Sequence, residues 1–182
     1  MKKTSQIAAV LTFWALLVFA GANQAQAIGL DGANLKIGIN LTREQTVGFG
    51  GAIGGQFDSH QWMVGSSVDV GSLFIPKLHF VPGGDFVVQD NLKVFVANAD
   101  FVYFFHQSSK GRGYAGAGFG THFYRIDGAS NDTKISLNVP LGFQRKLGSG
   151  MAWFGEMKLV IADDEHDSAL QFAVGLSFGS LD

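Results

Sequence analysis

The chain has 182 residues, with 25 glycines, 17 phenylalanines and no cysteine, a length that suits one domain or two small ones. Hydrophobic residues make up 47% and charged residues 15%, which excludes a disordered chain because disorder requires low hydrophobicity and high charge. The formal net charge of -2, without any basic stripe, argues against a nucleic-acid partner. The lack of cysteine excludes disulfides and thiolate metal sites. We predict no cofactor.

The first 27 residues have the three parts of a secretory signal peptide. Lys2 and Lys3 precede an apolar run over residues 7–20, and an Ala-x-Ala motif ends at Ala27. The run is shorter than the ~20 residues that a spanning helix needs. A cleaved leader is therefore favoured over an uncleaved membrane anchor, and the predicted mature chain, Ile28–Asp182, is one β-barrel domain.

The rest of the chain shows an apolar residue at every second position. The clearest example is residues 134–144, whose apolar face consists of Ile135, Leu137, Val139, Leu141 and Phe143. Such alternation predicts strands with one apolar face and one small or polar face. In chain order the predicted strands cover 34–41, 46–57, 61–74, 91–105, 113–125, 133–146, 151–161 and 168–179.

Most of these strands are separated by short, turn-rich links, at 42–45, 58–60, 107–112, 127–132, 147–150 and 162–167. The exception is 75–90, which contains Pro82, Gly83 and Gly84 and is interpreted either as a long loop or as a segment into which one or both flanking strands extend as a tall hairpin. The links are too short for helical crossovers, so we predict an antiparallel, up-and-down sheet.

The glycine-bearing faces decide between two kinds of barrel. Gly48, Gly50 and Gly54 share a face with few Lys or Glu residues, while the opposite face carries Phe49 and Ile53. Small residues suit the narrow interior of eight strands, and large apolar residues directed at lipid define a membrane barrel. The charged or titratable residues on the small-residue faces then form a predicted polar network in the lumen, consisting of Lys36, Asp69, Asp100, His122, Glu156 and Lys158.

Three segments, Tyr114–Tyr124, Trp153–Lys158 and Leu170–Phe178, resemble the small outer-membrane β-barrel proteins, the OmpA-like and OmpX-like group of eight-stranded barrels. The resemblance implies both termini in the periplasm, short periplasmic turns at 58–60 and 147–150, and longer outer loops at 75–90, 127–132 and 162–167. It also implies three kinds of partner: outer-membrane lipids, lipopolysaccharide and the outer-membrane insertion machinery. The chain departs from the pattern at its end, because four residues follow Phe178 where the family usually stops at an aromatic residue.

Two histidines have both a chemical and a structural interpretation. His106 and Ser108 have the H-x-S spacing of eight-stranded lipid A deacylases, but no glutamate follows in the next strand, so a polar turn is preferred over an activated nucleophile. His122 could meet Asp100 or Glu156 across the lumen. It is interpreted as a hydrogen-bonded interior histidine rather than a proton-linked gate.

Two further motifs are weighed in the same way. The acidic run 163–167 is interpreted as a solvated hairpin tip rather than a divalent-ion site. The glycines of 116–120 lack the following helix that a phosphate-binding loop requires. We therefore predict no metal site and no enzymatic activity.

The prediction is an all-β protein: a monomeric, eight-stranded, antiparallel up-and-down transmembrane β-barrel in the bacterial outer membrane. Its lumen is plugged by side chains, and its structural or surface-interaction role is carried by outer loops. The principal alternative is a soluble, exported calycin-like barrel with a hydrophobic ligand inside. A lipid A-modifying membrane enzyme and a small pore are less favoured. The membrane barrel requires Ile135, Leu137, Phe172 and Val174 to face outward.

Overall fold

A computed structural model describes residues 30–42, 59–89, 92–126, 132–162 and 168–179. The predicted leader (1–27) and the predicted strand 46–57 lie outside the described residues. Among the described residues, no helix has the length and apolarity needed to cross a membrane. The strands are β1 (Gly32–Thr42), β2 (Ser59–Asp69), β3 (Leu78–Gln89), β4 (Leu92–Ser108), β5 (Gly111–Ile126), β6 (Asp132–Gly148), β7 (Met151–Ala162) and β8 (Ala169–Gly179).

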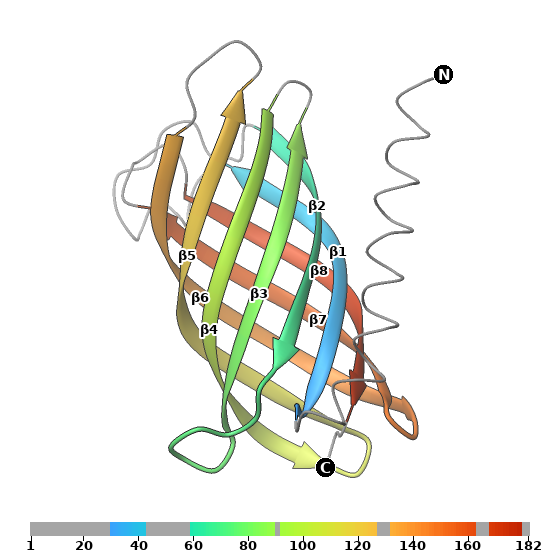
Figure 1. Cartoon of the computed structure of the whole chain (residues 1–182). Coiled ribbons are helices and arrows are strands. Elements are labelled where there is room, and N and C mark those ends of the chain that lie inside the picture. Colours follow the sequence, from blue (N-terminus) through green and yellow to red (C-terminus); the bar gives the residue numbers. More distant parts are fainter. Residues whose placement is uncertain (1–29, 43–58, 90–91, 127–131, 163–167, 180–182) are drawn as a thin grey trace.

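The eight strands close into an antiparallel barrel in which each strand pairs with its neighbours in sequence (Figure 1). Closure is made by β1 and β8, which pair from Gly32 opposite Gly179 to Thr42 opposite Ala169. A closed sheet has no free edge, so every strand has a neighbouring strand on both sides. The start of β1 and the end of β8 lie at one end of the barrel, called the terminal rim below, and the other end is called the distal rim. The predicted fold class is confirmed.

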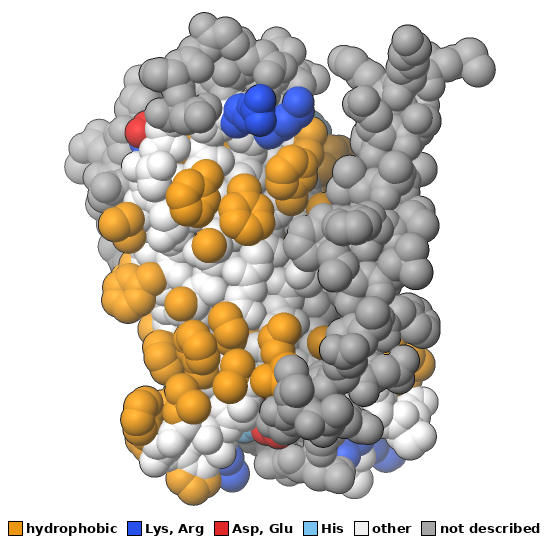
Figure 2. All heavy atoms as spheres, in the orientation of Figure 1, with side chains coloured by type: hydrophobic (Ala, Val, Ile, Leu, Met, Phe, Trp, Pro, Cys, Tyr) orange, Lys and Arg blue, Asp and Glu red, His pale blue; other side chains and the backbone are white. Residues whose placement is uncertain are grey.

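The outer surface of the barrel is apolar and its interior is polar. Ile135 and Val174 are 59% and 57% exposed, and Leu137 and Phe172 also face outward. Figure 2 shows hydrophobic side chains over much of the visible wall. A soluble carrier would bury these side chains around a cavity, so that alternative is wrong, and the polarity is that of a membrane barrel.

The interpretation of 75–90 as an outer loop is wrong, because most of this segment forms β3, and the alternative of an extended hairpin agrees with the pairing of β3 with β4. The ladder between β2 and β3 ends at Gly83, so the preceding residue, Pro82, has no partner in that ladder. Proline has no N–H to donate and is tolerated at such a position. Gly83 is required by crowding, since a Cβ at this position would lie 2.7 Å from the carbonyl oxygen of Ser66. These two residues mark an irregularity within a strand, and the sequence alone suggested a turn.

The links also differ from those predicted. At the terminal rim they are 70–77, 109–110 and 149–150, while the link from β3 to β4 at the distal rim is 90–91. The predicted turn 58–60 is wrong where it is described, since Ser59 and His60 belong to β2. The predicted strand 61–74 likewise ends at Asp69. Of the remaining predicted outer loops, 127–131 and 163–167 lie outside the described residues.

Candidate functional site in the lumen

The inward faces of β1, β3, β4 and β7 bring buried charges together in the middle of the barrel. The shortest ion pair joins Lys158 of β7 to Asp100 of β4, with 2.7 Å between Nζ and Oδ2. The two side chains are 3% and 8% exposed. A buried charge requires a partner, and each of these residues supplies one for the other.

A second group of charges centres on Lys36 of β1. Its Nζ lies 3.1 Å from Oδ1 of Asp85 on β3 and 3.4 Å from Oε1 of Glu156 on β7. The other carboxylate oxygen of Glu156 accepts a hydrogen bond of 2.9 Å from the Tyr114 hydroxyl on β5. One lysine thus bridges two carboxylates that come from opposite parts of the sequence.

Two asparagines join these groups into one lumen network. The Asn138 amide donates to Asn98 Oδ1 at 2.8 Å and to Asp100 Oδ1 at 3.1 Å. The Asn98 amide donates in turn to Asp85 Oδ2 at 2.8 Å. Since Asn138 is fully buried, its amide has to be satisfied by other side chains, and these bonds connect the Lys158 pair with the Lys36 group.

His122 joins the same network from β5. Its Nε2 lies 2.8 Å from the Ser136 hydroxyl, and that hydroxyl donates to Asn138 Oδ1 at 3.1 Å. The imidazole is therefore linked to Asp100 through two intermediate side chains, and it stacks on Tyr124 with 6.1 Å between the ring centroids.

Inward-facing glycines provide the space for the lumen network. A Cβ on Gly65 would overlap the Asp85 carboxylate, and a Cβ on Gly118 would overlap that of Asp100. On Gly142 it would overlap the Tyr114 ring. The glycine-rich faces in the sequence thus correspond to the backbone positions beside which the larger polar side chains lie.

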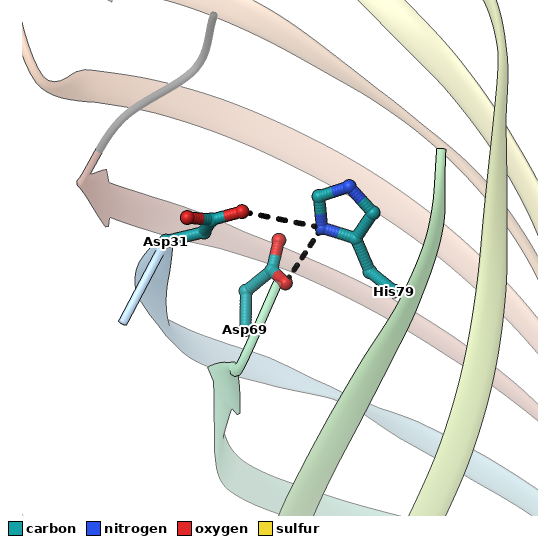
Figure 3. A group of neighbouring side chains, drawn as sticks. All are labelled: Asp31, Asp69 and His79. Carbon is teal, nitrogen blue, oxygen red and sulfur yellow. Dashed lines mark hydrogen bonds and ion pairs between the residues drawn. The ribbon is translucent and has the colours of Figure 1, made fainter. Parts of the chain in front are cut away.

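A second cluster, called the rim cluster, lies at the terminal rim and contains Asp31, Asp69, His79 and Arg112 (Figure 3 shows the first three). His79 Nδ1 lies 2.8 Å from Asp69 Oδ1 and 3.7 Å from Asp31 Oδ2. Arg112 lies 3.9 Å from the other oxygen of Asp69. The guanidinium also stacks 3.7 Å from the centroid of the Phe104 ring and donates to Gln144 at 2.8 Å.

Metal binding is chemically conceivable at the rim cluster, where Asp31, Asp69 and His79 offer three ligand atoms within 4.8 Å of one another. Two carboxylates and an imidazole are ligands that suit a first-row divalent ion. Asp69, however, is already paired with Arg112 and accepts a bond of 2.9 Å from the Gly71 amide. The observed contacts are therefore those of a salt-bridged cluster that joins the ends of β2, β3 and β5.

The residues predicted for the lumen divide between these two clusters. The lumen network contains Lys36, Asp100, Glu156, Lys158 and, through Ser136, His122. Asp69 instead lies in the rim cluster.

Several members of the two clusters were absent from the prediction. Asp85 and His79 lie in the segment 75–90, for which a loop was one of two interpretations, and Arg112 lies at the end of the predicted link 107–112, where β5 has already begun. Extending the alternation across Pro82 would have placed Asp85 and His79 on the inner face. Tyr114 and Asn138 already fell on inward faces, and their roles become visible only from their neighbours across the barrel.

The H-x-S motif lies at the terminal rim, at the end of β4. Ser108 closes the turn 109–110: its hydroxyl donates to the Gly111 carbonyl at 2.9 Å and accepts from the Gly111 amide at 3.2 Å. These bonds are those of a polar turn.

A closed sheet, an apolar exterior and a paired, polar interior together define a transmembrane β-barrel. Together with the solved structures that share its fold, this places the protein in the bacterial outer membrane. The fold is similar to the crystal structure of Neisserial surface protein A (NspA), with a TM-score of 0.63 and 13% identity over 83% of this chain and 97% of that one. It is also similar to the N-terminal β-barrel domain of Pseudomonas aeruginosa OprF, with a TM-score of 0.58 and 11% identity over 82% of this chain and 98% of that domain. No protein-family model matches the sequence, and no curated protein matches it.

Proposed function

We propose that the mature protein, Ile28–Asp182 after removal of the leader 1–27, is a monomeric, non-catalytic barrel with a structural or surface-interaction role. Its terminal rim faces the periplasm, and its distal loops carry the interactions. The observation that carries the proposal is the lumen network, in which buried charges of β1, β3, β4 and β7 pair across the interior. Two cavities that described residues enclose inside the barrel have volumes of about 40 and 80 Å³, enough for a few waters, which supports a lumen closed to larger solutes.

Conductance in planar bilayers tests the closed lumen. The wild-type protein is expected to give little or no current, because the Lys36 group occupies the interior. A triple variant, Lys36→Ala with Asp85→Ala and Glu156→Ala, is expected to give open-channel steps. The matched control Ile37→Ala changes the neighbouring outward-facing residue of β1 and should behave as wild type. Steady ion currents through the unmodified protein would rule out a side-chain plug.

Lipopolysaccharide is the proposed lipid partner, bound at the distal rim by Lys93 and Arg125. The two residues are direct partners across β4 and β5, and both are exposed on the lipid-facing side. Like charges in this arrangement repel each other, so a phosphate between them would stabilise the sheet. Next to this pair on the outer wall, Phe95 and Phe123 stack with centroids 6.1 Å apart, in a position to contact acyl chains.

Thermal unfolding in detergent with added lipopolysaccharide tests this site. Lipopolysaccharide should raise the melting temperature of the wild type, and the double variant Lys93→Ser/Arg125→Ser should lose most of that rise. Arg145→Ser, which removes an exposed cation at the opposite rim, should keep it. An equal rise with dephosphorylated lipopolysaccharide would show that the phosphate is not what these cations recognise.

The proposed insertion signal is the alternating apolar face of β8, from Leu170 to Phe178. This face is outward along the strand, with Phe172 and Val174 41% and 57% exposed. A Phe178→Ala variant should reach the outer membrane less efficiently than wild type, whereas a chain truncated after Phe178 should be inserted normally. Unchanged insertion of Phe178→Ala would argue that the machinery reads another feature.

A further inference from the structure

The link 70–77 at the terminal rim has an exposed apolar tip. Leu73, Phe74 and Ile75 are consecutive, and their exposed fractions are 48%, 83% and 56%. In Figure 1 the link reaches outward beyond the barrel wall, and in Figure 2 hydrophobic side chains continue from the lower part of the wall to that corner. Three adjacent exposed apolar residues are costly in water and indicate an interaction surface.

The tip is held in place by backbone hydrogen bonds. The Leu73 amide donates to the Leu78 carbonyl at 3.3 Å, and the Leu78 amide donates to the Ile75 carbonyl at 3.0 Å. The Phe104 amide of β4 donates to the Lys77 carbonyl at 2.8 Å. The tip is thus an ordered extension of β3 that presents its side chains in a fixed direction.

Lys77 has an unfavourable backbone conformation in this turn. Its φ is 72°, and it follows Pro76 at the third position of the turn Ile75–Leu78, where a type II turn normally has glycine. The left-handed region is unfavourable for a residue with a side chain, because the Cβ comes too close to the following carbonyl oxygen. A lysine in that conformation points to a use for its ammonium group.

Three exposed cations lie at the described part of the terminal rim, where the 46% exposed Asp31 is close to His79. Lys77, Lys110 and Arg145 are exposed there. The carboxylates of the rim cluster, Asp31 and Asp69, face His79, and Asp69 also faces Arg112. An anionic surface is therefore the complement of this rim.

We propose that the 70–77 link is an interfacial anchor, which inserts Leu73, Phe74 and Ile75 into the adjacent lipid leaflet while Lys77 binds the phosphate of an anionic phospholipid. Apolar and aromatic residues beside cations are the composition of segments that lie in the membrane interface. Lipid is the occupant because the tip continues the lipid-facing wall. The inference rests on the proposed membrane insertion of the barrel.

The absence of native cysteine allows a single environment-sensitive fluorophore at each chosen position. The full-length mature barrel is refolded into vesicles carrying label at Phe74→Cys, at Val139→Cys in the middle of β6, or at Ser149→Cys in another turn of the same rim. Brominated lipids should quench the labels at 74 and 139 several-fold more than the label at 149. If the label at 139 is quenched while the label at 74 is fully exposed to solvent, the proposed anchor is wrong and the membrane insertion of the barrel still holds. Absence of quenching at both would overturn the barrel's insertion itself.

The lipid class is tested with Lys77→Gly, which removes the ammonium group and supplies the residue that the turn geometry prefers. The vesicles mix ordinary phosphatidylcholine with phosphatidylglycerol that is brominated on its acyl chains. In the protein that keeps Lys77, the label at position 74 should be quenched more strongly than random mixing of the two lipids predicts, because Lys77 draws the brominated anionic lipid to the link. Lys77→Gly should lose that enrichment and keep its quenching in uniformly brominated vesicles. Equal enrichment in both proteins would contradict phosphate recognition by Lys77.

Discussion

The pair formed by Lys158 and Asp100 illustrates what charged residues do inside this barrel. Both are buried, and Asp100 also accepts a bond from Asn138. Removal of one member of a buried pair leaves the other charge without compensation and typically costs about 3–5 kcal/mol, far more than the net stabilisation supplied by the intact pair.

Lys158→Met should accordingly lower the free energy of unfolding by about 3 kcal/mol or more, measured by urea titration in lipid vesicles. The double variant Lys158→Met/Asp100→Leu should recover much of that loss, because no unpaired charge remains. A double variant as unstable as the sum of the two single variants would show that the two residues act independently.

Inward-facing glycines also contribute to the stability of the barrel, because they leave space for the buried polar side chains. Gly118→Val should destabilise the barrel by roughly 1–3 kcal/mol or prevent refolding, because the added side chain overlaps Asp100. Gly148→Ala is the control, since nothing lies within 4 Å of a Cβ at that position. Both are measured by the fraction of refolded protein and by urea titration. A fully stable Gly118→Val would mean that the lumen can repack around Asp100.

At the scale of elements, β3 shows why an irregular strand is hard to recognise. Pro82 and Gly83 are turn-forming residues in most contexts, yet here the proline lies beyond a ladder end and the glycine faces a crowded neighbour. Pro140 of β6 is accommodated similarly: the ladder with β5 is interrupted between Asn138 and Leu141, and that with β7 continues. Local propensity cannot reveal where a neighbouring ladder stops.

The junction of β1 with β8 gives a test of closure and register. Ile37 and Val174 are directly opposite and both face outward, so their Cα atoms fall within the span that a disulfide bridges. Ile37→Cys/Val174→Cys should form a disulfide on mild oxidation of the folded protein, detected by altered electrophoretic mobility. Ile37→Cys/Phe172→Cys, displaced by two residues, should form it much less. Equal yields would mean that the register is not fixed.

At the scale of the whole molecule, the apolar wall requires hydrocarbon around it. A closed barrel satisfies its backbone groups internally, which is the condition for crossing a bilayer. Polar residues satisfied inside and apolar residues exposed outside are stable in lipid and unstable in water.

The exported protein should therefore remain with envelope membranes through a carbonate wash and be released only by detergent. Immunoblotting of the fractions measures this, with a soluble periplasmic protein and a known outer-membrane barrel as the two references. Release by carbonate alone would contradict an integral membrane barrel.

The sequence by itself determined the all-β class and the lipid-facing side of segments such as 133–146 and 168–179. These follow from alternation at every second residue, which is a local property of an extended chain. The same alternation also placed Lys36, Asp100, Glu156 and Lys158 on inward faces. Only the tertiary structure decided that Asp85 pairs with Lys36, that Asp69 and Arg112 meet at the terminal rim, and that 78–89 is a strand. Contacts across a barrel depend on the register and closure of all eight strands together, and no local pattern encodes the distance between residues that lie 43 or 49 positions apart, as these pairs do.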